Sequence, residues 1–262
     1  MNKLFSLSEN ESAKYGKHYT ILCDIDSTNN YAKKLGTYLE NGHVVIADTQ
    51  HSGRGRQGKN FYSPKDEGLY MSLIIKDKAI VNDELFTVKI CLAVCRAIDR
   101  ITGTDNNNGV GIKWVNDIYF RSKKLCGILC EKCKGDDGEE FVVAGIGVNL
   151  SLDKTKLPKE ISKLATSLYD LTKQSYDKFT LSALICESLE EFLNPQKNVE
   201  DIIDEYRKRS VVIGREINII QNDKSIRAAA LDICSDGGLL VRTEEGFTQK
   251  LCGGEITIRT KK

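Results

Sequence analysis

The first 210 residues alternate short apolar runs with longer stretches of helical period. The apolar runs predict strands at residues 18–25, 43–48, 69–76, 111–114, 123–131 and 141–150. A helical spacing of apolar residues predicts helices at residues 31–39, 84–102, 181–193 and 199–209. Polar turns are expected at residues 103–109 and 134–138, and the second turn joins the last two strands into a hairpin.

The pattern changes after Gly214 to short alternating strands separated by tight turns. These strands are expected at residues 215–220, 226–233, 238–242, 247–251 and 255–258, with turns around Gly237 and Gly246. This spacing predicts a small antiparallel barrel. The chain is therefore divided into an expected catalytic domain at 1–210 and a C-terminal domain at 211–262.

Composition narrows the class of protein. The chain has 262 residues, 40% hydrophobic and 29% charged, with a formal net charge of +1. It shows no global attraction to nucleic acid or to a membrane, no secretory leader and no membrane-spanning run. We expect a cytoplasmic location. Six of the nine cysteines lie within apolar patterns and are expected to be buried thiols: Cys23, Cys91, Cys95, Cys126, Cys186 and Cys234. The pair Cys130-x-x-Cys133 has no second metal-binding pair, so no metal site is expected there.

The loop that follows the apolar run at residues 44–47 carries glycines at 53, 55 and 58 with Arg54 and Arg56 between them. Its spacing satisfies G-x-G-x-x-G, but a dinucleotide fingerprint needs a helix after the last glycine. Residues 59–64 have no helical period and end at a proline. A solvated basic loop is the plain alternative. Glycines that bring the backbone close to a ligand and arginines that pair with anions favour a mobile cationic flap.

Three further polar or glycine-rich positions have two interpretations each. Ser27-Thr28-Asn29 cap a helix or bind a small polar ligand. Lys124 begins a strand as a guard against aggregation or acts in catalysis. Glycines inside strands, at 127, 145 and 147, weaken the strands or mark a place where a ligand lies against the backbone.

Taken together, these segments resemble the biotin–protein ligases, also called biotin–[acetyl-CoA-carboxylase] ligases, from about residue 20 to residue 259. The markers are 27–29 (STN), 53–58 (GRGRQG), 113–117 (KWVND), 124–131 (KLCGILCE) and 145–149 (GIGVN), in the order and spacing of that family. The resemblance implies an α+β fold: a mixed sheet with flanking helices, like the core of class II aminoacyl-tRNA synthetases, followed by an SH3-like barrel. It also implies a two-step reaction through biotinyl-5′-adenylate.

The resemblance also implies roles for individual residues, with Lys124 and Arg56 as catalytic residues. The implied biotin contacts are Ser27, Thr28, Asn29, Gln50, Arg54, Gly55, Arg56, Lys124, Gly127, Gly145 and Gly147. The implied ATP and adenylate contacts are Arg54, Arg56, Lys59, Phe61, Asn116, Asp117, Lys124, Asn149, Thr166 and Ser167. Gly145 and Gly147 are expected to leave room for the valeryl tail of biotin. Magnesium is expected to accompany ATP, without a dedicated protein site.

The implied partner is the biotin carboxyl carrier domain of acetyl-CoA carboxylase or a related carboxylase. The stretch before Ser27 is too short for a three-helix DNA-binding domain, so a monofunctional ligase without DNA binding is expected. Monomer and homodimer both stay open. The alternatives are a lipoate–protein ligase, a non-catalytic biotin sensor or DNA-binding repressor, and a C-terminal barrel that serves as an adaptor.

Overall fold

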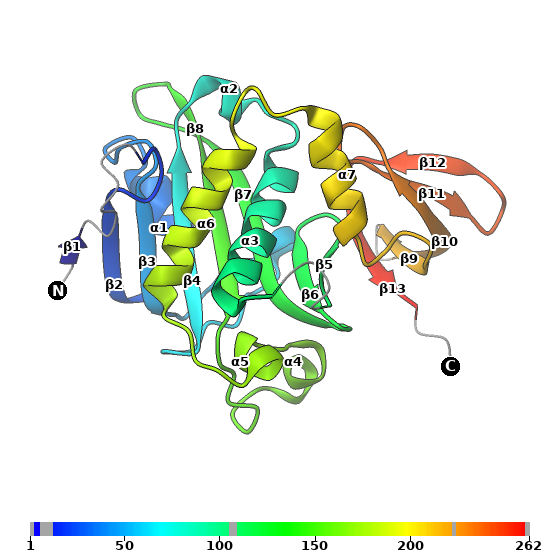
Figure 1. The fold of residues 1–262 in the computed structure, drawn as a ribbon, viewed down its shortest axis with the longest axis horizontal. Coiled ribbons are helices and arrows are strands. Elements are labelled where there is room, and N and C mark those ends of the chain that lie inside the picture. Colours follow the sequence, from blue (N-terminus) through cyan, green and yellow to red (C-terminus); the bar gives the residue numbers. More distant parts are fainter. Residues whose placement is uncertain (1–2, 6–12, 105–108, 222–223, 260–262) are drawn as a thin grey trace.

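The structure, a computed structural model, describes residues 3–5, 13–104, 109–221 and 224–259. They form one large and one small sheet with helices around them (Figure 1). The large sheet has the strand order β1-β2-β3-β4-β8-β7-β6-β5. Its strands are β1 (Lys3–Phe5), β2 (Tyr19–Ile25), β3 (Val44–Gln50), β4 (Gly68–Ile75), β5 (Val110–Lys113), β6 (Asp117–Phe120), β7 (Lys123–Lys134) and β8 (Glu140–Asn149). Only β2 and β3 pair in parallel among these strands, so the expected mixed sheet is confirmed.

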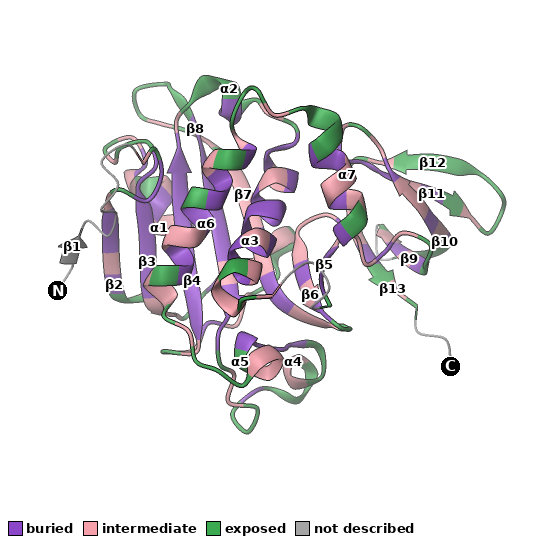
Figure 2. Ribbon diagram, in the orientation of Figure 1, coloured by how far each residue is buried: buried purple, intermediate pink, exposed green. Residues whose placement is uncertain are grey.

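The central strands are covered on both faces because their side chains alternate between two cores. Helices α3 (Phe86–Thr102) and α6 (Lys178–Phe192) lie side by side across one face (Figure 1). On β4, Met71 and Leu73 join the core on that face, while Ile74 packs with Ala32 of α1 (Thr28–Leu35) in the second core. All residues of β4 are buried, and Figure 2 shows the middle strands of the large sheet mostly in the colour of buried residues.

Local signals explain where the longer helices begin and end. Ser27 caps α1 by accepting a hydrogen bond from the Asn30 backbone N–H, as its residue type favours. Helix α3 ends at Gly103, whose φ of 65° lies in the left-handed region that glycine adopts readily. The short elements α2 (Lys78–Val81), α4 (Lys159–Leu164) and α5 (Leu168–Thr172) were not predicted, nor were β1 and β6.

The small sheet is antiparallel throughout, with the strand order β12-β11-β10-β9-β13. Its strands are β9 (Glu216–Gln221), β10 (Lys224–Ile233), β11 (Leu239–Thr243), β12 (Thr248–Leu251) and β13 (Glu255–Ile258), close to the five predicted ones. Helix α7 (Val199–Arg209) leads into it. The Trp114 indole N–H, next to β5, donates to Gly237 O between β10 and β11 of the small sheet (2.9 Å), and Arg207 Nη2 of α7 donates to Ile233 O of β10 (2.8 Å).

Four of the six cysteines expected to be buried are buried: Cys91, Cys95, Cys126 and Cys186. Cys234 is half-buried, and Cys23 is exposed because it lies near the end of β2, where Asp24 is exposed as well. All nine cysteines are free thiols. Within the predicted turn at 103–109, residues 105–108 lie outside the described residues. In the described part of the chain, no helix has the length and apolar character that crossing a membrane requires.

Candidate active site

A pocket opens on the sheet face that carries α1. Its floor is formed by β4, β8 and β7, and its walls by the first turn of α1, the turn between β5 and β6, and residues 51–63, which we call the flap. Gly254 and Glu255 of the small sheet complete it. Of the predicted site residues, all line this pocket except Asn149, Thr166 and Ser167.

One row of the pocket floor explains Gly145. This glycine is paired with Ser72 of β4 on one side and with Leu129 of β7 on the other. The Asn29 side chain crosses this row: its Oδ1 accepts from Ser72 Oγ (2.6 Å) and its Nδ2 donates to Leu129 O (3.3 Å). A Cβ on Gly145 would lie 2.1 Å from Asn29 Oδ1. The Asn29 amide therefore lies against Gly145, and the expected contact of Gly145 with the valeryl tail stays a prediction.

The next row of the floor is covered by the flap. Gly147 is paired with Tyr70 and Gly127, and the Phe61 ring lies directly above it, where a Cβ on Gly147 would come within 2.4 Å of the ring. The Phe61 and Tyr70 rings meet edge to face at 6.4 Å between centroids. Lys124 Nζ lies 5.9 Å from the Phe61 ring centroid. Here, too, a side chain occupies the space that the glycine leaves.

The α1 end of the pocket is lined mainly by neutral polar side chains. Gln50 Oε1 accepts from the Thr28 backbone N–H (2.8 Å), and Gln50 Nε2 donates to Ser63 Oγ (2.9 Å). Thr28 Oγ1 also accepts from Ser72 Oγ (2.8 Å). These groups fix one another, so a neutral ligand with several donors and acceptors meets hydrogen-bonding groups that are already oriented.

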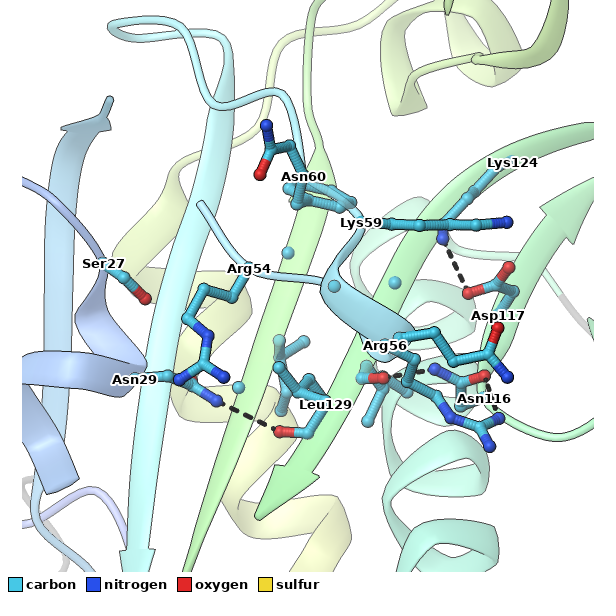
Figure 3. Close-up of a pocket in the computed structure, with 18 of the residues that line it drawn as sticks. Ser27, Asn29, Arg54, Arg56, Lys59, Asn60, Asn116, Asp117, Lys124 and Leu129 are labelled. Carbon is cyan, nitrogen blue, oxygen red and sulfur yellow. Dashed lines mark hydrogen bonds and ion pairs between the residues drawn. The ribbon is translucent and has the colours of Figure 1, made fainter. Parts of the chain in front are cut away.

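The opposite end of the pocket is cationic (Figure 3). Lys124 Nζ forms an ion pair with Asp117 Oδ1 at 2.7 Å, and Arg56 Nη1 donates to Asn116 Oδ1 at 3.2 Å. Lys59 of the flap pairs with Glu255 of the small sheet. Each of these three cations is therefore paired with an oxygen of a neighbouring side chain. An incoming anion can replace that oxygen or share the cation with it.

Lys113, also on the pocket wall, was not predicted as a site residue. Burial lowers the pKa of its ammonium, and the Lys124 charge adds to that lowering, against the opposing effect of Asp117. Its Nζ lies 5.5 Å from the Tyr119 ring centroid. A half-buried ammonium in this position favours an anionic ligand, because such a ligand would restore part of the stabilisation that water gives elsewhere.

The flap is a compact loop and not the start of a nucleotide-binding helix. The Gly55 N–H donates to Lys59 O (2.7 Å) and the Phe61 N–H donates to Gly53 O (2.8 Å), so the flap folds back on itself. Its single turn of 3-10 helix (Arg56–Gly58) ends at Gly58, and the chain then runs on toward β4. The dinucleotide interpretation of its glycines is therefore excluded, as expected.

The three predicted residues that do not line the pocket lie behind Lys124. Asn149 is buried and donates through Nδ2 to Thr166 O (2.9 Å) and Lys124 O (3.5 Å). The Thr166 backbone N–H also donates to Lys124 O (2.9 Å), and Ser167 caps α5. In this geometry Asn149 and Thr166 support the backbone of Lys124.

Glu131 and Glu255 were also missed as residues with a role at the site. Glu131 belongs to the motif at 124–131, but only the folded chain brings its carboxylate to Arg54 of the flap (3.2 Å). Glu255 lies far along the chain from Lys59, so neither periodicity nor spacing could connect them.

Two family profiles match the chain, and together they cover both sheets. Residues 21–149 match the biotin/lipoate A/B protein ligase family, and residues 212–259 match the biotin protein ligase C-terminal domain. The chain belongs to the biotin protein ligase family. The pocket described above is built mainly from the first matched segment, while Glu255 comes from the second.

Relatives of this ligase chain span nearly its whole length. The bifunctional ligase/repressor BirA of Escherichia coli (strain K12) is 28% identical over 251 residues, which cover 94% of this chain and 75% of that protein. The biotin–[acetyl-CoA-carboxylase] ligase of Mycobacterium tuberculosis is 28% identical over 219 residues, 82% of this chain and 78% of that protein. The structure of biotin protein ligase from Aquifex aeolicus in complex with biotin and ATP has a TM-score of 0.77 at 27% identity, covering 93% and 99% of the two chains.

Proposed function

We propose that this chain is a biotin–protein ligase that activates biotin with ATP and transfers it to a lysine of a biotin carboxyl carrier domain. The observation that carries the proposal is the division of one pocket into a neutral polar end and a cationic end over a floor of strand backbone. Biotin has a neutral ureido ring at one end and a carboxylate at the other. The Mycobacterium tuberculosis relative is named for acetyl-CoA carboxylase, so we propose that carboxylase as the source of the acceptor.

In the first step, the biotin carboxylate attacks the α-phosphate of ATP, the bond to the β-phosphate breaks, and biotinyl-5′-adenylate and pyrophosphate form. Thr28, Asn29 and Gln50 are proposed to hold the ureido ring, because a buried ureido group without partners would lose most of its binding energy. Lys124 is proposed to draw the two anionic reactants together and to stabilise the charge of the transition state. Arg56, Lys59 and the backbone of the flap are proposed to close over the nucleotide.

In the second step, the amine of the acceptor lysine attacks the acyl carbon of the adenylate, an amide forms, and AMP leaves. Between the steps the adenylate must be kept from water. Phe61 is proposed to pack against the ligand in this closed state, in place of its contact with Gly147. The Arg54-Gly55 backbone is proposed to follow the biotin ring.

Magnesium is proposed to enter with the ATP phosphates, where it supplies charge neutralisation for the departing pyrophosphate. Asp117 and Glu255 are the carboxylates at the cationic end that could hold it, but each already pairs with a lysine. In the described part of the chain, no group of three metal-binding side chains exists. This favours a metal carried by the substrate over a metal that resides in the protein.

The finer features of the family are part of the same proposal. Residues 1–210 are proposed as the catalytic domain and residues 211–262 as an SH3-like barrel; Asn149, Thr166 and Ser167 are proposed to order around the adenylate. A cytoplasmic location is supported by nine free thiols, and the absence of a DNA partner by a net charge of +1. The proposal holds for a monomer and for a homodimer alike, since one chain supplies every residue named.

The transfer reaction tests the proposal. The chain is incubated with ATP, magnesium, biotin and a purified biotin carboxyl carrier domain, and the mass of the acceptor is measured. A gain of one biotinyl group, lost when the acceptor lysine is replaced by arginine, is expected. The first profile also covers lipoate ligases, so a parallel reaction contains lipoate and a lipoyl domain. Modification of the lipoyl domain alone, or of neither acceptor, would overturn the proposal.

A further inference from the structure

The carboxylate of Glu131 joins two parts of the site that are far apart in sequence. Glu131 lies on β7, and its side chain is only 19% exposed. Its Oε1 accepts from Lys33 Nζ of α1 (2.9 Å) and forms an ion pair with Arg54 Nη2 of the flap (3.2 Å). Its Oε2 accepts from Asn29 Nδ2 (2.9 Å). One carboxylate therefore holds α1, the flap and the amide that crosses the pocket floor.

Arg54 has a second anchor on the same helix. Its Nη1 donates to Asn30 Oδ1 (2.9 Å), and the Asn30 amide in turn donates to Asp26 Oδ2 (2.6 Å). Arg54 also forms a backbone bridge with Asn60, at the opposite side of the flap. Fixing the Arg54 side chain thus fixes both sides of the flap and, one residue beyond Asn60, the position of Phe61.

Glu131 supplies the negative charge that offsets two neighbouring cations. Lys33 and Arg54 bring two positive charges to the same carboxylate oxygen. Burial raises the pKa of Glu131, but hydrogen bonds from Asn29 and Lys33 and the charges of Lys33 and Arg54 outweigh it, so the pKa lies below its ordinary value. Neutralising Glu131 would leave the two cations to repel each other, and Arg54 lies on the loop that is free to move away.

We propose that Glu131 is a positioning residue, which holds Arg54 and Asn29 in place and so sets the closed position of the flap over the biotin end of the pocket. Glu131 does not line the pocket itself and acts through these two residues. The inference deepens the proposed function, and its effect on biotin rests on that function. The effect of Glu131 on opening of the flap can be measured without any ligand.

The test compares Glu131→Gln with Glu140→Gln in ligand-free protein by hydrogen exchange and mass spectrometry. Glu140 is a matched control: it lies on the same hairpin and pairs with Lys132 at 2.9 Å, but both side chains are largely exposed. Glu131→Gln keeps the shape of the side chain and removes its charge. We expect amide exchange in residues 51–63 to become about tenfold faster in Glu131→Gln, since the loss of a charged hydrogen-bond partner lowers the cost of local opening. Glu140→Gln should leave it unchanged.

A double-mutant cycle with Arg54→Gln decides whether Glu131 acts through Arg54. Each single variant should speed exchange in the flap, and the double variant should add little to either, because the same contact is lost. Independent, additive effects would overturn the proposal. Unchanged exchange in the flap would overturn it too, as would exchange that rises equally throughout the large sheet.

The catalytic readout separates positioning from general loss of structure. Glu131→Gln should raise KM for biotin about tenfold, with kcat within about twofold and KM for ATP raised by a clearly smaller factor than KM for biotin, because Arg54 and Asn29 lie at the biotin end of the pocket. A parallel fall in kcat with both substrates would contradict the assigned role. If the unmodified protein does not use biotin at all, the proposed function fails, while the exchange experiment still reports on the hold of Glu131 over the flap.

Discussion

Replacing Lys124 by methionine removes one positive charge from the cationic end of the pocket and keeps most of the aliphatic stem. The ammonium of Lys124 lies 2.7 Å from Asp117, and the two side chains are 33% and 19% exposed. In such a partly buried site, two unit charges 4 Å apart interact by about 4 kcal/mol at an effective dielectric constant of about 20. Losing one preorganised donor at a developing negative charge costs about 3 kcal/mol.

Since 1.36 kcal/mol corresponds to a factor of about ten in rate, Lys124→Met should slow biotin adenylation by roughly 100- to 1,000-fold. The unpaired Asp117 carboxylate would add repulsion toward the phosphates. The fold should survive, because the lost ion pair is partly exposed and contributes about 1 kcal/mol or less to the free energy of unfolding. The assay is biotin-dependent exchange of labelled pyrophosphate into ATP, accompanied by a thermal unfolding curve.

The matched control is Lys123→Met, the preceding residue of β7, which does not line the pocket. Its exchange rate should stay within about twofold of the unmodified protein, because neighbouring residues of a strand point to opposite faces of the sheet. A Lys124→Met variant that retains more than about a third of the original rate would refute the role of Lys124. An equal loss in both variants would assign the effect to the strand instead.

The remaining predictions concern three other positions. Gly145→Ala should cost roughly 1–3 kcal/mol in the free energy of unfolding and weaken biotin binding, because the new Cβ would lie 2.1 Å from Asn29 Oδ1; denaturant unfolding and calorimetry measure these effects. The lowered pKa of Lys113 makes the folded chain bind fewer protons than the unfolded chain between the folded value and 10.5, so stability should rise with pH in that window. Lys113→Met should abolish this rise in a pH series of Tm, raise Tm at pH 7, and raise KM for ATP roughly tenfold. Trp114→Phe should lower stability by about 1 kcal/mol, seen as a lower Tm, because it leaves Gly237 O without its donor (2.9 Å).

The sequence predicted those parts of the fold whose pattern repeats over enough residues. Helix α7 matches its predicted bounds, and α3 begins two residues later than predicted. By contrast, α1 was expected at 31–39 and forms at Thr28–Leu35, because its cap at Ser27 and not its apolar spacing sets its start. Elements of three to six residues, such as β1 and α4, are too short to show a helical or strand period.

Most of the predicted site residues lie in short motifs and line one pocket, but the sequence could not predict which side chains they pair with. The sequence predicted a ligand close to the backbone of Gly145, but it gave no sign that the Asn29 side chain, more than 100 residues earlier in the chain, lies against this glycine. The pairs of Arg54 with Glu131 and of Lys59 with Glu255 depend on how the sheets and the flap come together. Such contacts have no local signal, since a charged residue on a strand is usually solvated.

Biotin-dependent ATP–pyrophosphate exchange, run in parallel with lipoate and octanoate, shows in one experiment which acid the chain activates. We expect exchange with biotin and none with the other two acids, because the neutral polar end formed by Thr28, Asn29 and Gln50 suits a ureido ring. Exchange with lipoate or octanoate in place of biotin would move the chain to the lipoate branch of its family. A folded protein that exchanges with none of the three acids would show that the pocket does not activate biotin.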